Sequence, residues 1–301
     1  MSDVIEIRGL RKRYGRTTAL DGLDLTVAAG EVHGFLGPNG AGKSTTIRVI
    51  LGLARASGGE VRVFDRDPWR DSVAVHERIG SVPGDVALWP TLSGGEAIDL
   101  ICRLRGSQRD RAAYDRERAR LISAFQFDPR KKGRAYSKGN RQKVALIAAF
   151  AVPAALYVFD EPTSGLDPLM ESVFNQEVAR VAAAGATVLL SSHILSEVER
   201  LCTRVSIVRA GRVVEAGTLA ELRHLTRTEI SFAVEGVPDA RVAAIPYAHD
   251  LAVEHGRVRF SVDSAQVGRV LSSLGDLPLA SLRVAPPTLE ELFLRHYGDR
   301  L

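Results

Sequence analysis

The segment Gly37–Thr45 constrains this chain more than any other, because it reads Gly-Pro-Asn-Gly-Ala-Gly-Lys-Ser-Thr. The pattern G-x-x-x-x-G-K-S is a phosphate-binding loop when a strand enters it and a helix leaves it. The run from Glu31 to Leu36 predicts that strand, and the apolar spacing of Thr45–Leu53 predicts that helix. We therefore expect a site for a nucleoside triphosphate.

Each residue type in this loop has a physical task. The glycines let the backbone turn tightly and aim N–H groups at phosphate oxygens. The helix that begins near Lys43 adds its positive N-terminal end. Lys43 brings a full charge to the β- and γ-phosphates, and the hydroxyl of Ser44 is placed to ligate Mg²⁺. The predicted nucleotide-binding residues of the loop are Gly37, Pro38, Asn39, Gly40, Ala41, Gly42, Lys43, Ser44 and Thr45.

Composition limits the class of protein. A length of 301 residues accommodates one large domain or two smaller ones, and 45% hydrophobic with 25% charged residues is ordinary for a globular protein. A formal charge of +4 suits an anionic ligand or a membrane surface and is too small to argue for nucleic acid. The distant Cys102 and Cys202 predict two reduced thiols in a cytosolic protein.

The sequence predicts neither a signal peptide nor a transmembrane segment. The first residues, Met1–Glu6, lack the basic and apolar regions of a signal peptide. The longest apolar run, Val144–Phe159, is interrupted by Pro153 and is shorter than a spanning helix. A role at a membrane would therefore need a partner protein.

Strand and helix patterns alternate through the first two thirds of the chain. Val4–Ile7 and Leu23–Val27 alternate and predict two antiparallel strands, with Leu10–Thr17 as a basic loop between them. Such strands ahead of the phosphate loop favour a β-layer beside an α/β core. The short apolar runs Leu156–Phe159 and Ala186–Leu190 are typical of strands in a buried parallel sheet.

Arginines are concentrated in one helical stretch, with acids interleaved. This pattern predicts a solvated helical surface, and a surface toward anionic lipid headgroups or a membrane partner is the alternative. The arginines are Arg103, Arg105, Arg109, Arg111, Arg116, Arg118 and Arg120.

The composition changes after residue 225. Strand patterns at Glu229–Val234, Leu251–Val253, Val258–Val262 and Leu282–Val284 alternate with helical patterns at Pro238–Ala244, Ala265–Leu274 and Leu289–His296. The outline β-α-β-β-α-β predicts a small α+β module of ferredoxin-like type. We expect a nucleotide-binding domain at 1–226, with a helical subdomain at about 86–150, and an accessory domain at 227–301.

Two acids end the apolar strand Leu156–Phe159. Asp160 would reach the edge of the sheet, where a carboxylate holds Mg²⁺ through water opposite the phosphate loop. Glu161 follows directly, and its carboxylate could orient or deprotonate an attacking water.

With Tyr136–Asn140, Asp160-Glu161, the turn Ser164–Asp167 and His193 in this order, residues 1 to about 225 resemble the ATP-binding cassette (ABC) ATPases. The motif set is specific, because several independent motifs must occur in one order. The resemblance implies a P-loop core with a mostly parallel sheet, an antiparallel β-layer and a helical subdomain. It also implies ATP as substrate and Mg²⁺ as cofactor.

The resemblance carries roles onto individual residues. Tyr14 matches the aromatic that stacks on adenine, Asp160 the Mg²⁺ carboxylate and Glu161 the catalytic glutamate. His193 matches the histidine that senses the γ-phosphate. Ser137, Lys138, Gly139 and Asn140 match the signature that binds the γ-phosphate held by the opposite subunit, and Ser164, Gly165, Leu166 and Asp167 match the turn at the dimer interface.

The chain departs from the family pattern in two places. Leu92–Glu96 reads Leu-Ser-Gly-Gly-Glu and looks more like the usual signature, but no long helix leads from it to the Asp160 strand, so we interpret it as a decoy. Gly84 stands where the family has a glutamine or an acid. Either Asp85 substitutes as a possible Mg²⁺ ligand, or the contact is missing and coupling to the membrane partner differs.

The signature variant with Lys138 resembles the branch that powers bacterial drug, polysaccharide and lipid exporters, as does the tail Ala285–Tyr297. The resemblance implies a cytoplasmic ATPase subunit at the inner face of the membrane, bound to a separate permease. A homodimer is the simplest assembly, and a different cassette partner is the alternative.

Rival classes are a cassette ATPase acting on ribosomes or DNA, and a P-loop GTPase or kinase. The chain has neither the second cassette, the coiled-coil insert nor the guanine-reading motif of these classes.

Overall fold

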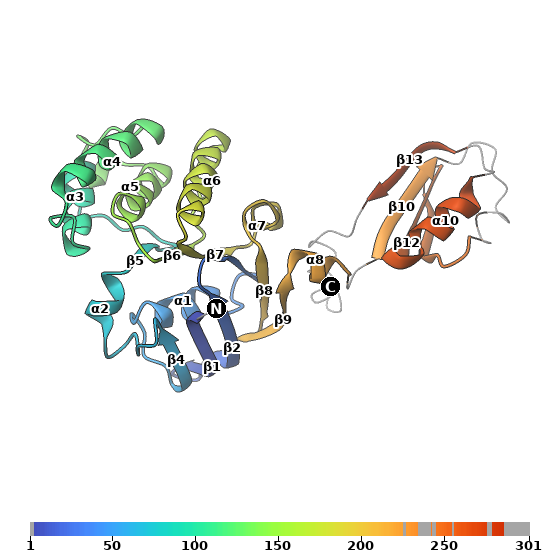
Figure 1. Cartoon of the computed structure of the whole chain (residues 1–301), viewed down its shortest axis with the longest axis horizontal. Helices are drawn as coiled ribbons and strands as arrows, with labels where there is room; N and C mark the ends of the chain where they lie inside the picture. Colours follow the sequence, from blue (N-terminus) through green and yellow to red (C-terminus); the bar gives the residue numbers. More distant parts are fainter. Residues whose placement is uncertain are drawn as a thin grey trace. The chain divides into compact units, whose positions relative to one another are not determined.

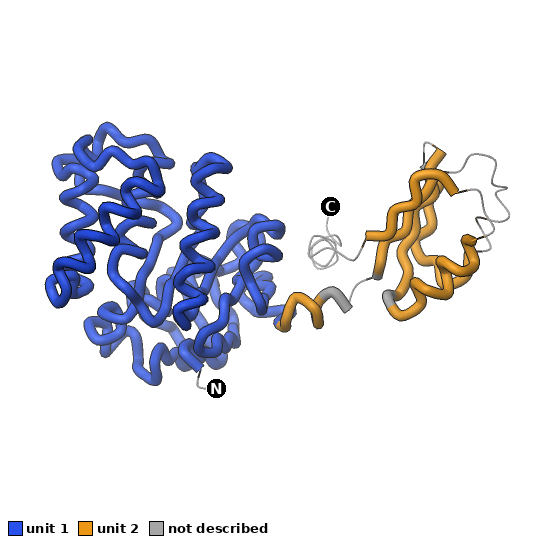
Figure 2. The backbone as a smooth tube through the Cα atoms, turned by 45° about the horizontal axis from the view of Figure 1, so that its top comes forward, with its two compact units in different colours: residues 1–216 blue, residues 217–301 orange. Residues whose placement is uncertain are grey.

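The computed structural model describes residues 3–224, 227–233, 242, 245–254, 256–275 and 279–285. It forms two compact units, Met1–Ala216 and Gly217–Leu301 (Figure 2). The division falls before α8 (Leu219–His224), whereas the sequence places a boundary after residue 226, and that boundary stays a prediction. The tail Ala285–Tyr297 and the helices predicted at Pro238–Ala244 and Leu289–His296 fall almost wholly outside the described residues.

A six-stranded sheet forms the centre of the first unit, in the order β5-β6-β7-β3-β8-β9. The four pairs from β5 to β8 are parallel. β3, β6 and β7 are buried along their whole length, as expected for a parallel sheet covered on both faces. The bounds are β3 (Val32–Leu36), β5 (Ile79–Val82), β6 (Leu156–Asp160), β7 (Thr187–Ser192), β8 (Arg204–Arg209) and β9 (Arg212–Thr218).

An antiparallel sheet lies beside this core and confirms the predicted β-layer. Its order is β2-β1-β4, with β1 (Asp3–Tyr14), β2 (Thr17–Ala28) and β4 (Gly58–Val63). The basic loop expected at Leu10–Thr17 was wrong, because β1 continues to Tyr14 and only a two-residue turn separates it from β2. Leu10 pairs with Leu23 and both are fully buried, so cross-strand packing keeps this basic segment extended.

Three helices, α3, α4 and α5, group together at one side of the sheet (Figure 1). They lie within residues 86–150, where a helical subdomain stays a prediction, and α5 is buried along most of its length. Aromatic rings of Phe150, Tyr157, Phe159 and Phe174 pack between α5, β6 and α6. The helices are α1 (Lys43–Ile50), α2 (Ser72–His76), α3 (Gly94–Leu104), α4 (Arg111–Ala124), α5 (Lys138–Phe150), α6 (Pro168–Ala183) and α7 (Leu195–Leu201).

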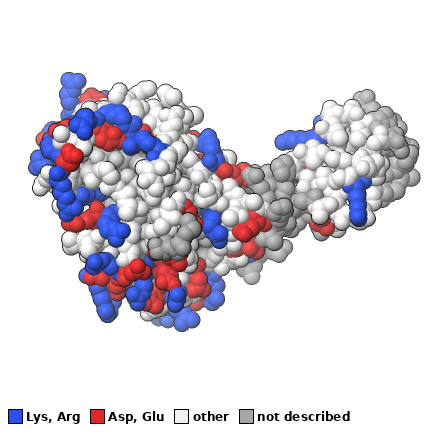
Figure 3. All heavy atoms as spheres, viewed as in Figure 1, with Lys and Arg blue, Asp and Glu red and all other residues white. Residues whose placement is uncertain are grey.

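The arginine-rich stretch is only partly the solvated surface that its pattern predicts. The Arg105 guanidinium is part-buried and donates to the carbonyls of Ala148, Ala149 and Val152, which satisfies orphan carbonyls at the end of α5. Arg120 pairs with the buried Glu177 of α6 at 2.7 Å. Elsewhere, Lys and Arg are mixed with Asp and Glu over the visible face of the first unit (Figure 3).

The second unit contains a four-stranded antiparallel sheet in the order β11-β12-β10-β13. One face carries its own core, which includes Phe232, Phe260 and Leu274, the last on α10. The elements are β10 (Arg227–Ala233), β11 (His249–Glu254), β12 (Arg257–Asp263), α10 (Val267–Leu274) and β13 (Ala280–Ala285).

Among the described residues, no helix combines the length and the apolar character needed to cross a membrane.

Candidate nucleotide site

The sheet order brings four strand ends together at one edge. β5, β6, β7 and β3 are consecutive in the sheet, and parallel strands end at the same edge. Gly84 follows β5, Asp160 ends β6, His193 follows β7, and the phosphate loop follows β3. In open α/β sheets, ligands bind at the carboxyl ends of the strands, so this edge is the candidate site.

The loop has the backbone geometry that its glycines predict. Gly40 and Gly42 have φ values of 82° and 112°, a region that favours glycine. A Cβ on Gly37 would lie 2.5 Å from the carbonyl oxygen of Val208, so this position also has no room for a side chain. α1 begins at Lys43 and directs its N-terminal N–H groups toward the loop.

Lys43 is buried at the base of the loop, with 5% of the residue exposed. Its ammonium donates to the carbonyl oxygens of Gly37 at 2.6 Å and Pro38 at 3.2 Å. Burial lowers the pKa of Lys43, while the charges of Glu161 and Asp160 act against that shift. The carbonyl oxygens of Gly37 and Pro38 therefore hold the lysine ammonium at the loop, and phosphate oxygens could replace them.

The carboxylate of Glu161 lies between Lys43 and His193, which the sequence predicts to act with Glu161 in catalysis. Its Oε1 is 3.9 Å from Nζ of Lys43 and 3.4 Å from Nδ1 of His193. Its backbone has a φ of 47°, which is uncommon for a residue with a side chain. The N–H of Glu161 donates to the carbonyl oxygen of Ser191 at 3.1 Å, which helps to hold this conformation.

Asp160 is buried, and its Oδ1 accepts a hydrogen bond of 2.6 Å from Oγ of Ser191. Ser191 is a contact that the sequence analysis missed. The sequence shows a serine near the end of a strand, but the partner of that serine depends on the register between β6 and β7.

The donors at this edge fit Mg²⁺. Oδ2 of Asp160 and Oγ of Ser44 make no hydrogen bond to any described residue, so a carboxylate and a hydroxyl oxygen are available. Oxygen ligands of this kind, completed by phosphates and water, are what Mg²⁺ prefers. The described residues contain no cluster of three or more His, Cys, Asp or Glu side chains that could hold a metal ion.

Gly84 lies against Asp160. A Cβ at position 84 would be 3.1 Å from Oδ2 of Asp160, which is a tight contact. Asp85 is exposed and makes no hydrogen bond or ion pair with the described residues. Glycine thus keeps the space beside Oδ2 of Asp160 free of a side chain.

The segment Ser137–Asn140 begins α5 and contacts the predicted interface turn. Ser137 caps the helix by accepting from the N–H of Asn140 at 3.3 Å, and Lys138 donates to Oγ of Ser164 at 2.7 Å. A Cβ on Gly139 would lie 2.4 Å from the carbonyl oxygen of Gly165. The two motifs therefore form one surface. Asp167 ends the turn and caps α6 through the N–H of Met170.

The rejected segment Leu92–Glu96 has a structural explanation. Ser93 and Glu96 form a reciprocal capping box at the start of α3. A Cβ on Gly94 would lie 2.4 Å from the hydroxyl of Tyr136, and one on Gly95 2.9 Å from the Arg118 guanidinium. Helix capping and close packing thus account for the Ser-Gly-Gly-Glu residues.

Tyr14 ends β1 and is 47% exposed. Nζ of Lys12 lies 4.7 Å from its ring centroid, so a cation already covers part of the aromatic surface. An exposed ring at a strand end can accept a base in stacking.

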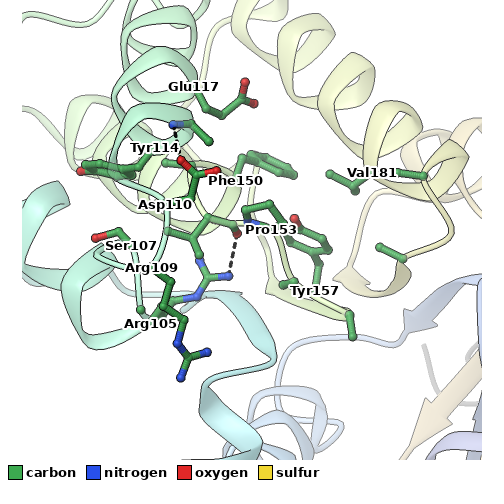
Figure 4. A pocket seen from close by; sticks show the side chains of 18 of the residues that line it. Arg105, Ser107, Arg109, Asp110, Tyr114, Glu117, Phe150, Pro153, Tyr157 and Val181 are labelled. Atoms are coloured by element: carbon green, nitrogen blue, oxygen red, sulfur yellow. Dashed lines mark hydrogen bonds between the residues drawn. The ribbon is translucent and has the colours of Figure 1, made fainter.

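A cleft of about 760 Å³ opens elsewhere, between α4, α6 and the start of β6 (Figure 4). Phe150, Tyr157 and Val181 line it with apolar surface, and Arg109 and Glu117 contribute charge. None of the predicted site residues lines it. This cleft is therefore distinct from the nucleotide site.

A phosphate loop, a buried aspartate and a glutamate–histidine pair at the carboxyl edge of a parallel sheet define a P-loop nucleotide hydrolase. The sequence model of the ABC transporter family matches residues 20–164. The daunorubicin resistance ATP-binding protein DrrA3 of Streptomyces coeruleorubidus is 37% identical, and the match covers 98% of this chain and 96% of that protein. The linearmycin resistance ATP-binding protein LnrL of Bacillus subtilis (strain 168) is 30% identical, with 99% of each chain covered.

Solved structures agree with these sequence matches. The ATP-binding subunit of an ABC transporter superposes with a TM-score of 0.69 at 32% identity, over 74% of this chain and 92% of that chain. A bacterial ABC transporter cassette solved as a dimer shares the fold, with a TM-score of 0.63 at 24% identity over 71% of this chain and 98% of that chain.

The chain belongs to the ABC transporter ATP-binding proteins, in the exporter branch, and it is an ATPase. This family membership confirms the resemblance drawn from the motifs.

Proposed function

We propose that the carboxyl edge of the sheet binds Mg²⁺-ATP and hydrolyses its γ-phosphate bond. The observation that carries this proposal is the position of the Glu161 carboxylate, within 4 Å of both Lys43 and His193. In this role the ammonium of Lys43 binds the β- and γ-phosphates in place of the loop carbonyls. Mg²⁺ would be held by Ser44 and Asp160 and would neutralise phosphate charge.

Glu161 is the group that acts on the attacking water. Its side chain is 28% exposed, so water can reach it, and the carboxylate as an acceptor orients a water and takes its proton. His193 is half-exposed, and its Nδ1 contacts the same carboxylate. A movement of this ring would therefore change its contact with Glu161. Tyr14 stacks on the adenine.

The complete site needs a second cassette. Ser137–Asn140 is tied to the turn Ser164–Asp167, and no hydrogen bond or ion pair among the described residues links it to the phosphate loop. A two-fold axis would bring the signature of one chain to the nucleotide of the other and form two equal sites. A homodimer is therefore the proposed assembly, with a different cassette as the alternative.

The membrane partner is a separate permease that holds the ATPase at the inner face of the cell membrane. Large apolar side chains are exposed on or beside α2 and α3 and on the segment after Gly84, namely Trp69, Val73, Trp89 and Leu104. Exposed apolar residues of this size are suited to a protein interface. The names of the two full-length relatives support a drug or antibiotic as the exported substrate.

The C-terminal sheet is of ferredoxin-like type in this proposal. The strand order β11-β12-β10-β13 and its antiparallel pairing match a β-α-β-β-α-β chain in which the first and third strands are central. α10 occupies the position of the second helix.

Two variants test the site. Lys43→Ala removes a charge-assisted contact worth about 1.5–3 kcal/mol, so ATP affinity should fall about 10–100-fold. Glu161→Gln should still bind ATP and hydrolyse it at least about 100-fold more slowly, because general-base catalysis contributes that much. Glu171→Gln, in the first turn of α6, is the control and should keep normal turnover. Normal turnover in Glu161→Gln would exclude this assignment.

A further inference from the structure

Ser191 has a buried hydroxyl that contacts the Asp160 carboxylate and the backbone N–H of Glu161. Asp160 and Ser191 are direct partners in the register of the parallel strands β6 and β7, so the two side chains leave the sheet on the same face. Ser191 is fully buried, and its O–H donates to Oδ1 of Asp160 at 2.6 Å. Its Oγ also accepts from the N–H of Glu161 at 3.3 Å.

The directions of these hydrogen bonds are fixed. A hydroxyl has one proton to donate, and an ionised carboxylate can only accept. The proton of Ser191 is therefore committed to Asp160, and a lone pair of Oγ receives the N–H of Glu161. This chain of contacts sets the rotation of the Asp160 carboxylate.

The other oxygen of Asp160 faces a position without a side chain. Oδ2 has no hydrogen bond to the described residues and lies where a Cβ on Gly84 would approach to 3.1 Å. The carboxylate is thus held from the β7 side alone. Without the Ser191 hydroxyl, the described structure offers no other hydrogen bond to fix its orientation.

We propose that Ser191 is the positioning residue of the metal site, and that it binds Oδ1 of Asp160 so that Oδ2 is presented to the nucleotide-bound Mg²⁺. This inference rests on the proposed function, since it takes Asp160 as the metal carboxylate. Hydrogen-bond partners of ligating carboxylates typically change metal affinity 10–100-fold when removed.

The test measures metal binding directly. Mn²⁺ serves as the spectroscopic probe, and its binding to the ATP-loaded full chain is titrated by electron paramagnetic resonance. Ser191→Ala should weaken Mn²⁺ binding about 10-fold. ATP binding in the presence of EDTA should stay unchanged. The Mg²⁺ concentration for half-maximal ATPase activity should rise about 10-fold, while the rate at saturating Mg²⁺ stays close to that of the parent.

Matched variants separate positioning from general damage. Ser206→Ala removes another buried hydroxyl of the same sheet, which contacts Nε2 of His33 at 2.9 Å, and it should leave Mn²⁺ affinity unchanged. Ser191→Thr keeps the hydroxyl and should restore most of the affinity. Ser191→Cys replaces it with a weak donor of similar size and should behave like Ser191→Ala, which keeps the test usable if the alanine variant does not fold.

The variant Asp160→Asn separates two claims: that Asp160 is the metal carboxylate, and that Ser191 positions it. If Asp160→Asn loses Mn²⁺ binding and both Ser191→Ala and Ser191→Cys retain it, the positioning role of Ser191 is overturned and the site stands. If Asp160→Asn also binds Mn²⁺ as the parent does, the assignment of Asp160 as metal carboxylate is overturned as well.

Discussion

Single residues of the site can be tested by the type of contact that each makes. Tyr14 presents an exposed ring at the end of β1, and base–aromatic stacking is worth on the order of 1–3 kcal/mol. Tyr14→Ala should therefore weaken ATP binding by about 5–100-fold in a fluorescence titration. Tyr14→Phe keeps the ring and should bind nearly as the parent does. Equal damage in both variants would mean that the hydroxyl, and not stacking, is what matters.

The contact between Glu31 and His33, at the start of β3, should make the free energy of unfolding depend on pH. Burial would raise the pKa of Glu31, but the hydrogen bond and charge of His33, at 2.8 Å, turn the net shift downward. A carboxyl whose pKa is lower in the folded state stabilises the fold. This contribution is complete at pH values above its ordinary pKa of 4.5, and it is lost as the pH falls through the pKa of the folded state.

Glu31→Gln should therefore lower the free energy of unfolding at pH 7 by about 1.5–3 kcal/mol, the range for a hydrogen bond to a charged group. The difference from the parent should shrink as the pH falls below the ordinary carboxyl value. Chemical denaturation at a series of pH values measures this. Glu60→Gln, in an exposed pair with Arg62, is the control and should change stability by less than about 0.5 kcal/mol. A difference independent of pH would contradict the linkage.

A network of charged side chains joins two helices of the first unit, α4 and α6. Arg120 of α4 binds Glu177 of α6 with two contacts of 2.7 Å, and Arg180 and Glu117 join the same network beside the cleft. Glu177 is buried and Arg120 is partly exposed, so solvent screens only one end of the pair. This network is a polar link between α4 and α6.

Arg120→Ala should destabilise the chain by about 1–2 kcal/mol, between the values for exposed and buried ion pairs. Thermal unfolding measures the loss. Arg111→Ala removes an exposed pair with Asp115 on the same helix and should lower the melting temperature much less, because solvent screens that pair. Equal melting temperatures for the two variants would mean that the Arg120–Glu177 contact does not stabilise the packing of α4 against α6.

At the scale of the whole molecule, the proposed homodimer makes its own prediction. Glu161→Gln should accumulate as an ATP-bound dimer, because ATP at both sites holds the two chains together by mass action. Adding Ser137→Arg places bulk and charge against the partner's nucleotide and should abolish that dimer. Size-exclusion chromatography with light scattering, with and without ATP, measures the assembly.

Ser93, which also caps a helix, provides the control for the Ser137→Arg variant. Ser137 and Ser93 both cap helices through an N–H three residues on, so each loses about 1 kcal/mol of capping when replaced. Ser93→Arg in the Glu161→Gln background should still dimerise, because Ser93 lies in the capping box of α3. A Glu161→Gln chain that binds ATP and stays monomeric would favour a different cassette partner or assembly on the permease.

The parts of this protein that depend on local chemistry can be predicted from its sequence. The phosphate loop needs glycines, a lysine and a serine at fixed spacing, so Gly37–Thr45 was recognisable without a fold. Short apolar runs that end in Asp160 and before Ser191 predicted buried parallel strands, and the order of the motifs predicted the family. The β-layer followed from alternation, although the pattern could not show that basic β1 stays extended as far as Tyr14.

The contacts between residues that are distant in the sequence depend on how the strands and helices pack. The register of β6 against β7 places Ser191 beside Asp160, and strand order places Gly84 against the same carboxylate. The two signature-like segments both begin helices at a serine, and their packing partners separate them: Gly139 lies against Gly165, whereas Gly94 lies against Tyr136. Sequence patterns report the period and propensity of one segment, but register and close packing are relations between segments, so folding alone establishes them.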